Sequence, residues 1–224
     1  MKQLLIFIPF LWFINISYSQ DIGYLKYYFY IFGIRAGEAD LKITNSQDYI
    51  FITSKVKTYP GLTLIVNVDD KVVSKVDKEF LKTLQRDTVS VGKSFRDTNT
   101  VIFDREKGLI FIDSLSFGTI TFSNTNDTIN DLATEVLRTM NWSKLPEKLT
   151  LNFLEITNTR YITLIKQKGL KYKIQEIKDA YIELTNINNK FVFYKAQIPV
   201  FYIFPFGNIG LYTELADFSF NSKN

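Results

Sequence analysis

Apolar and charged side chains alternate strictly in Ala39-Asp40-Leu41-Lys42-Ile43. The segment Tyr49–Val56 shows a similar two-residue period. Successive side chains of a β-strand point to opposite faces, so this period is typical of strands that bury one face and expose the other. The pattern therefore predicts strands of an antiparallel sheet with one covered face.

Residues that favour turns separate similar short segments along most of the chain. Further strands are predicted at 24–34, 71–77, 80–91, 102–104, 109–112, 117–122, 160–165, 170–174, 180–184, 191–194, 200–204 and 209–218. The segment 62–68 fits a strand or a short helix, and Gly33 and Gly37 are expected to bracket a turn. Open sheets of roughly ten or more strands tend to curl. We therefore predict an all-β fold with one main helix, whose large curved antiparallel sheet forms a barrel or half-barrel.

One amphipathic helix is predicted at about residues 128–141. Its apolar residues follow a 3.6-residue period and form a single stripe. They are Ile129, Leu132, Ala133, Val136, Leu137 and Met140. Asp127 or Thr128 can cap the first turn, and Arg138 places a cation in the last turn. A helix with one apolar stripe is expected to pack on or in the sheet.

Residues 1–19 have the features of a secretory signal peptide. Lys2 precedes the apolar stretch Leu4–Ile14, and Ser17-Tyr18-Ser19 supplies small residues for cleavage before Gln20. The apolar stretch is shorter than the roughly 20 residues of a membrane span. We expect an exported protein, periplasmic or extracellular, that is not an integral membrane protein once the leader is removed. The alternative is that residues 1–19 stay attached as an N-terminal anchor. Residues 20–224 are predicted to form a single β-rich domain.

The composition excludes several chemistries. The chain contains no Cys and no His, so it cannot form a disulfide, a Cys/His zinc site or a Ser-His-Asp triad. Its net charge of +4 falls to +3 without Lys2, a small surplus that gives no reason to expect a nucleic-acid partner. Asp69 and Asp70 point to opposite faces of a strand and match no calcium-loop spacing. We predict no metal and no cofactor.

Four segments resemble the bacterial exported family called "domain of unknown function 3108". They are Phe32-Gly33-Ile34-Arg35-Ala36-Gly37-Glu38-Ala39, the stretch from Lys57-Thr58 to Asp77, the helix end Leu137-Arg138-Thr139, and Ile198-Pro199-Val200 with Phe206-Gly207-Asn208-Ile209. The resemblance covers about residues 24–220. It implies an exported β-rich fold and carries no activity.

The charged motif within this resemblance has two readings. A charged pair at the mouth of a barrel could hold a polar head group, whereas the simpler reading is a turn in which Glu38 pairs with a nearby cation. We favour the structural reading, with Arg138 as the first hypothesis for the partner of Glu38. The predicted structural motif comprises Gly33, Arg35, Gly37, Glu38, Arg138 and Gly207.

An aromatic-rich stretch near the C-terminus suggests a ligand pocket. Its candidate ligand-binding residues are Phe191, Phe193, Phe201, Phe204 and Tyr212. Packing in the core is the simpler role for these rings, but a curved sheet of this size can also enclose one small ligand. The sequence therefore predicts a non-enzymatic binding protein for an apolar or lipid-like ligand. The alternative is a structural or interaction protein whose sheet face or edge contacts an envelope partner.

Enzymatic activity would have to use Asp, Glu, Lys, Ser or Tyr. Ser90 and Lys93 have the spacing of a Ser-Lys pair. That chemistry needs the serine at the start of a helix and a buried lysine, whereas this pair is predicted at the end of a strand beside Gly92. We therefore assign no catalytic residue.

Overall fold

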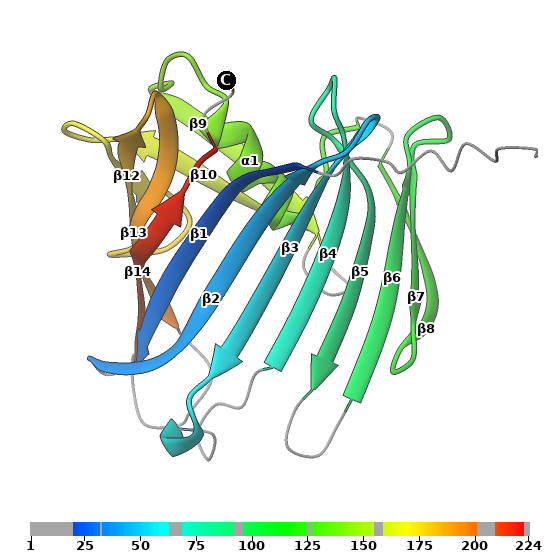
Figure 1. The fold of residues 1–224 in the computed structure, drawn as a ribbon, viewed down its shortest axis with the longest axis horizontal. Coiled ribbons are helices and arrows are strands. Elements are labelled where there is room, and N and C mark those ends of the chain that lie inside the picture. Colours follow the sequence, from blue (N-terminus) through cyan, green and yellow to red (C-terminus); the bar gives the residue numbers. More distant parts are fainter. Residues whose placement is uncertain are drawn as a thin grey trace, which may run out of the picture.

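The computed structural model describes residues 20–31, 33–62, 69–91, 96–124, 127–154, 159–200 and 209–221. Fourteen strands and one α-helix form the described part of the chain (Figure 1). The strands of the first half are β1 Gln20–Ile31, β2 Ile34–Asn45, β3 Tyr49–Thr58, β4 Asp69–Asp77, β5 Thr83–Val91, β6 Arg96–Asp104, β7 Leu109–Ser114 and β8 Gly118–Ser123. A short 3-10 helix, η1 Pro60–Leu62, follows β3, and the helix α1 Leu132–Met140 follows β8. The remaining strands are β9 Lys148–Leu154, β10 Thr159–Lys166, β11 Lys171–Ile174, β12 Tyr181–Ile187, β13 Lys190–Val200 and β14 Ile209–Ser219.

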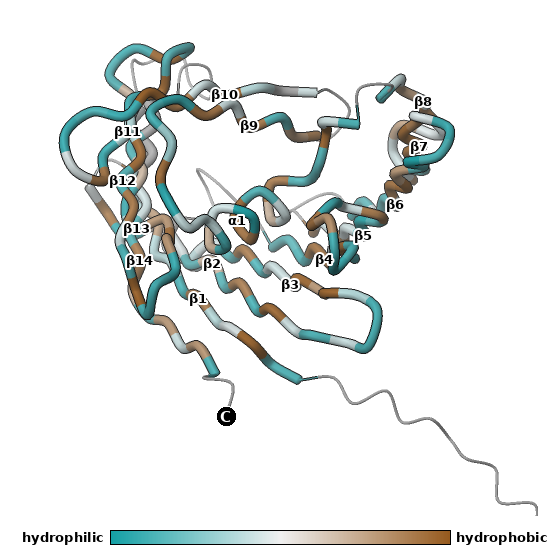
Figure 2. Tube along the Cα trace, turned by 90° about the horizontal axis from the view of Figure 1, so that it is seen from above, coloured by the Kyte–Doolittle hydropathy of each residue, from teal (hydrophilic) through white to brown (hydrophobic). Residues whose placement is uncertain are grey.

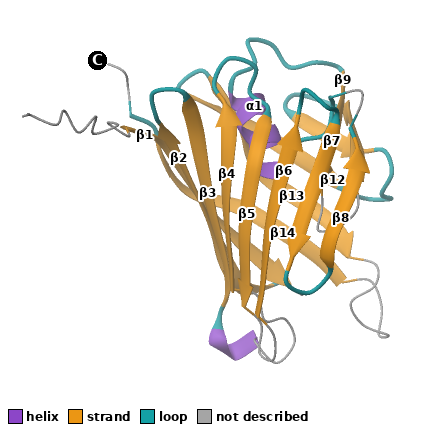
Figure 3. Ribbon diagram, turned by 90° about the vertical axis from the view of Figure 1, so that its right-hand side faces the viewer, coloured by secondary structure: helices purple, strands orange, loops and turns teal. Residues whose placement is uncertain are grey.

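All fourteen strands belong to one antiparallel sheet. Their order across it is β8-β7-β6-β5-β4-β3-β2-β1-β14-β13-β12-β11-β10-β9, so the first and last strands of the chain pair in the middle. The strands β8 and β9 are its two edges, and the sheet does not close on itself. Figure 3 shows the wall formed by the strands of the first half, side by side. The predicted all-β fold is confirmed, in its half-barrel form.

The two-residue period that predicts strands also fixes which side chains enter the core. In β2, Leu41 and Ile43 are buried and Lys42 between them is exposed. In β3, Ile50 and Ile52 are buried, and Ile52 lies opposite Ile43 in the ladder. Alternate positions of neighbouring strands therefore form one apolar inner face.

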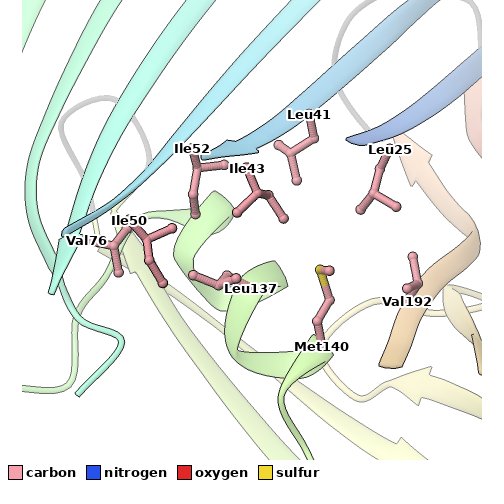
Figure 4. Packing of buried hydrophobic residues seen from close by; sticks show 9 residues of the cluster. All are labelled: Leu25, Leu41, Ile43, Ile50, Ile52, Val76, Leu137, Met140 and Val192. Carbon is pink, nitrogen blue, oxygen red and sulfur yellow. The ribbon is translucent and has the colours of Figure 1, made fainter. Parts of the chain in front are cut away.

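The helix α1 lies inside the curl of the sheet. Seen from above, β1 to β4 lie on one side of α1 and β9 and β10 on the other (Figure 2). Leu137 and Met140 of α1 point at the inner face of the sheet (Figure 4). Their neighbours in this cluster are Leu25, Leu41, Ile43, Ile50, Ile52, Val76 and Val192. The sheet thus curls around the helix and buries its apolar side chains.

The helix begins later than the sequence predicts. Asp131, and neither Asp127 nor Thr128, is its N-cap, because the Asp131 carboxylate accepts a hydrogen bond from the backbone N–H of Thr134 at 2.5 Å. The residue before the cap is held outside the helix. Asn130 forms a parallel bridge with Phe153 of β9, and this pairing uses its backbone groups.

The predicted apolar stripe of the helix is wrong at its first turn. Leu132 is 53% exposed, whereas Thr134, Glu135 and Thr139 are buried. The buried polar side of α1 has hydrogen-bond partners at the start of β5 and in the residue before the N-cap. Thr83 Oγ1 donates to Thr134 Oγ1 at 2.8 Å, and Asn130 Nδ2 donates to Glu135 Oε1 at 2.7 Å. A helix enclosed by the sheet can bury polar residues when each has such a partner.

The turn between β1 and β2 is shorter than predicted. Gly33 lies in this turn with φ of +75°, a conformation that favours glycine. Gly37 lies inside β2 opposite Phe29, so it does not bracket the turn. The predicted strand 80–91 also begins later, at Thr83, because Phe80 lies in the β4–β5 turn, where its N–H donates to Asp77 Oδ1 at 2.6 Å.

Several predictions fall outside the described residues: the leader 1–19, most of the segment 62–68, and Phe201, Phe204 and Gly207. Within the described residues, no helix combines the length and the apolar composition needed to cross a membrane.

Candidate functional site

A cleft of about 700 Å³ lies at one end of the half-barrel. Six separate parts of the chain contribute to it: β1, the β2–β3 hairpin, the β4–β5 turn, the end of α1, the β12–β13 turn and the segment after β14. Its lining residues are Ile22, Ile43, Asn45, Ile50, Lys78, Glu79, Leu81, Leu137, Met140, Asn141, Asn188, Lys190, Phe220 and Asn221. This end of the half-barrel is the one at which the described chain ends (Figure 1).

The floor of the cleft is apolar. Leu137 and Met140 of α1 meet Ile43 and Ile50 of the sheet there, and these four side chains belong to the main core cluster (Figure 4). Further partly buried apolar residues complete the lining: Ile22, Leu81 and Phe220. The cleft therefore opens directly onto the hydrophobic core.

The rim of the cleft is polar and carries two cations. Lys78 comes from the β4–β5 turn and Lys190 from the start of β13. Lys78 Nζ donates to the carbonyl of Ser46 at 3.5 Å, and Lys190 Nζ lies 5.9 Å from the centre of the Phe220 ring. Among the described residues, neither lysine has a carboxylate within ion-pair distance. Glu79 is the acid of the rim, and it is exposed.

Amide side chains supply the remaining polar groups. Asn141 is the C-cap of α1, and its Nδ2 donates to the carbonyl of Leu137 at 2.8 Å. Asn221 Nδ2 donates to the carbonyl of Asp21 at 2.6 Å. Asn45 Oδ1 is buried and accepts no hydrogen bond within the described part of the chain. A buried acceptor without a donor costs roughly 1–3 kcal/mol, so a donor from bound water or ligand would stabilise this position.

A second hollow, of about 280 Å³, adjoins the cleft and shares Asn221 with it. Its cation is Lys42, whose Nζ lies 2.9 Å from Asp21 Oδ2. The charge of this lysine is compensated, unlike the charges of the two lysines on the rim of the cleft.

The charged motif of β2 lies away from the cleft and forms a compact network. The Arg35 guanidinium stacks 3.1 Å from the centre of the Tyr28 ring, and its Nη2 donates to Tyr59 Oη at 2.6 Å. Glu38 Oε2 lies 2.9 Å from Lys26 Nζ and accepts from Tyr59 Oη at 3.1 Å. The hydrogen bond from Lys26 lowers the pKa of the Glu38 carboxyl below its usual range. Glu38 is thus paired with Lys26, while the Arg35 guanidinium lies against the rings of Tyr28 and Tyr59.

The predicted pairing of Glu38 with Arg138 is wrong. Arg138 Nη1 lies 2.9 Å from Glu135 Oε1, one turn away on α1. Glu38 instead meets Lys26, which lies on the neighbouring strand β1. Arg138 therefore contributes to the polar side of the helix and has no part in the motif of β2.

The described members of the predicted ligand-binding set, Phe191, Phe193 and Tyr212, do not line the cleft. Phe191 and Phe193 are partly buried against the cluster of β9 to β12, while Val192 between them packs on the cluster around α1. Tyr212 pairs with Tyr30, with ring centres 5.5 Å apart. The described members of this set are thus dispersed, and their role in ligand binding stays a prediction.

The sequence predicts the inward orientation of some residues that line the cleft, but not the cleft itself. Ile43, Leu137 and Met140 fall on predicted inner faces, but no local signal connects them with Lys78 or Lys190. Lys78 lies in the β4–β5 turn and Lys190 at the start of β13, and only the curl of the sheet brings them to one opening. In the described residues, no three Asp or Glu residues come together in a group that could hold a metal ion.

The fold is similar to the crystal structure of a beta-barrel-like protein of domain of unknown function DUF1849 from Brucella abortus, with a TM-score of 0.53. The alignment covers 91% of this chain and 99% of that chain at 8% sequence identity, so the likeness concerns the fold alone. Neither a protein-family model nor a curated protein sequence matches the chain. The resemblance to the "domain of unknown function 3108" therefore stays a prediction.

Proposed function

We propose that this is an exported, non-enzymatic binding protein that shelters an apolar or lipid-like ligand in the cleft at the end of α1. The observation that carries the proposal is a cleft of about 700 Å³ with an apolar lining. Its partly buried apolar residues are Ile22, Leu81 and Phe220, and the buried side chains of Ile43, Leu137 and Met140 lie beneath them. Pockets for small ligands occupy roughly 300–1,000 Å³ and combine apolar walls with a few polar groups. The predicted leader supports the export part of the proposal.

Burial of the ligand supplies the driving force. Each Å² of apolar surface removed from water stabilises a complex by roughly 25 cal/mol, so one alkyl chain on this floor would bind without any specific hydrogen bond. The lining comes from elements held together by the core cluster, and a preformed site loses little conformational entropy on binding.

A neutral apolar fluorophore tests the proposal. N-phenyl-1-naphthylamine should bind the full-length protein saturably, with one site per chain. Ile22 lines the cleft and is partly buried, so Ile22→Trp should fill the opening and weaken binding at least about tenfold. The matched control is Ile102→Trp, because Ile102 is exposed on β6 and does not line the cleft. Saturable binding that Ile22→Trp leaves unchanged would refute the proposal, as would the lack of saturable binding in the unmodified protein.

A second candidate function rests on the free edge of the sheet. The strand β8 pairs on one side with β7, and its other side has no strand among the described residues. Leu115 and Phe117, in the turn before β8, are 74% and 57% exposed. An exposed edge beside apolar side chains is a site at which another chain can add a strand.

Surface substitutions separate the two functions. An envelope partner that binds the edge should no longer be recovered with the Leu115→Asp or Phe117→Asp variant. It should still be recovered with Ile22→Trp. Recovery of the same partner in pulldowns with all three variants would remove this candidate.

A further inference from the structure

We infer that the cleft selects amphiphiles with an anionic head group, whose negative charge is held between Lys78 and Lys190 while the alkyl chain lies on the apolar floor. This inference rests on the proposed function and adds the chemical class of the ligand.

The two lysines approach the opening from different parts of the sheet. Lys78 belongs to the β4–β5 turn, on the same side of α1 as β3, and Lys190 opens β13. Both line the same cleft, although the sheet separates β4 from β13 by four intervening strands. A group at the opening is therefore exposed to positive charge from two directions.

The charges of both lysines are available to a ligand. Within the described part of the chain, neither Nζ forms an ion pair, whereas Lys42 of the adjoining hollow is neutralised by Asp21. Lys190 is only partly exposed, and its ammonium lies near the Phe220 ring, which provides a weak partner for a cation. A carboxylate or phosphate at the opening would give these ammonium groups an anionic hydrogen-bond partner, which neither has among the described residues.

Among the described residues that line the cleft, Glu79 is the one acid, and it partly offsets the charges of Lys78 and Lys190. The rim therefore keeps a surplus of one positive charge, which favours an anion over a neutral or cationic head group. Four asparagines of the lining are neutral donors and acceptors, and they add no preference of sign: Asn45, Asn141, Asn188 and Asn221.

The distribution of polarity orients the ligand. The lining residues from α1 and the inner faces of β2 and β3 that form the floor are apolar. The charged residues lie at the rim, in the β4–β5 turn and at the start of β13. A chain placed on the floor leaves its head group beside the turns and near water. Fatty carboxylates and alkyl phosphates from phospholipid breakdown share this chemistry.

The test compares ligands of equal chain length in displacing N-phenyl-1-naphthylamine from the full-length protein. Dodecanoate and dodecyl phosphate should bind about tenfold more tightly than 1-dodecanol, and dodecyltrimethylammonium should bind most weakly. Lys78→Gln and Lys190→Gln should each lower the affinity for the two anions about three- to tenfold and leave the affinity for 1-dodecanol unchanged. Glu79→Gln should raise the affinity for the anions, because it removes a negative charge that repels them. The relative affinities of dodecanoate and dodecyl phosphate indicate which source of the negative charge fits better.

The matched control is Lys168→Gln, an exposed lysine in the β10–β11 turn that does not line the cleft. Equal binding of the anion and the alcohol, or equal losses with Lys78→Gln and Lys168→Gln, would overturn this inference and leave the proposed function standing. If no ligand displaces the fluorophore, the proposed function fails and the inference with it.

Discussion

Gly37 has no side chain because Phe29 occupies the space that a Cβ would need. A Cβ built at this position would lie far inside van der Waals contact with the Phe29 ring and with the carbonyl oxygen of Lys57. The ring belongs to β1 and the carbonyl to β3, so any larger residue would separate three strands of the sheet. The glycine of the motif thus serves close packing and not an unusual backbone angle.

Gly37→Ala should therefore destabilise the protein by about 1–3 kcal/mol, the usual cost of an overpacked core position. Urea unfolding measures this cost. Gly61→Ala is the control, because a Cβ at Gly61 would have no described residue other than its chain neighbours within 4 Å. Its effect should stay within about 0.5 kcal/mol. Equal free energies of unfolding for the two variants would contradict this role of Gly37.

Glu38 makes the stability depend on pH. Its hydrogen bond with Lys26 lowers the pKa of the folded carboxyl, so the contribution of Glu38 is fully present above its unfolded pKa of about 4.3. This contribution is lost as the pH falls through the lower pKa of the folded state. Glu38→Gln should thus be less stable than the unmodified protein at pH 7, and the difference should shrink below about pH 4. Denaturant midpoints across this range measure it, and a difference independent of pH would contradict the ion pair.

The sequence predicts that Glu38 pairs with a cation, but not with which one. Its position in a charged motif suggests Arg138, which also lies in one of the segments that resemble the family. The partner is instead decided by strand register, since Glu38 lies opposite Tyr28 and close to Lys26 on β1. Register depends on how the whole β1–β2 hairpin pairs, and a local pattern does not contain that information.

At the scale of elements, α1 shows how far the periodicity of apolar residues predicts which side chains are buried. Leu132 and Leu137 lie on the same predicted apolar stripe, yet Leu132 is 53% exposed and Leu137 only 3%. Leu137→Ala should cost about 2–5 kcal/mol of stability, because it opens a cavity between the helix and β2 and β3. Leu132→Ala should cost no more than about 0.5 kcal/mol. Similar losses in thermal unfolding would contradict the orientation of α1.

Most strands are predictable because alternation of apolar and polar residues directly reflects a half-buried sheet. The start of α1 is not, because Asn130 follows the helical pattern but pairs with β9. The burial of Glu135 is equally hidden, since its partners are a residue of this bridge and Arg138. Periodicity locates the helix, whereas tertiary pairing decides where it begins and which of its polar residues are buried.

At the scale of the molecule, the cleft exists only because an open sheet curls around a helix. Turns far apart in the sequence then meet at one end, with core side chains beneath them. The sequence predicts the curled sheet and an apolar ligand beside Phe191, Phe193, Phe201, Phe204 and Tyr212, and this placement of the ligand stays a prediction. Of these residues, Phe191 and Phe193 pack on the cluster of β9 to β12, while Val192 between them packs on the cluster around α1.

Ligand length should be limited by the cleft. Each buried methylene contributes about 0.8 kcal/mol, so two more methylenes should tighten binding roughly tenfold or more from octanoate to decanoate to dodecanoate. The gain should end when the chain fills the space of about 700 Å³. Calorimetric titration of the series measures this dependence, and affinities that do not change with chain length would indicate that the floor is not used.

The most direct test of ligand binding in the cleft uses Met140. The sequence contains two methionines, and Met140 lines the cleft while Met1 lies in the predicted leader. Once the predicted leader is removed, Met140 is the one methionine, so protein labelled with ¹³C in the methionine methyl group reports on the cleft through a single resonance. We predict that dodecanoate shifts the Met140 resonance saturably and has no effect on it in the Ile22→Trp variant. A Met140 resonance that does not move during the titration would contradict binding in the cleft.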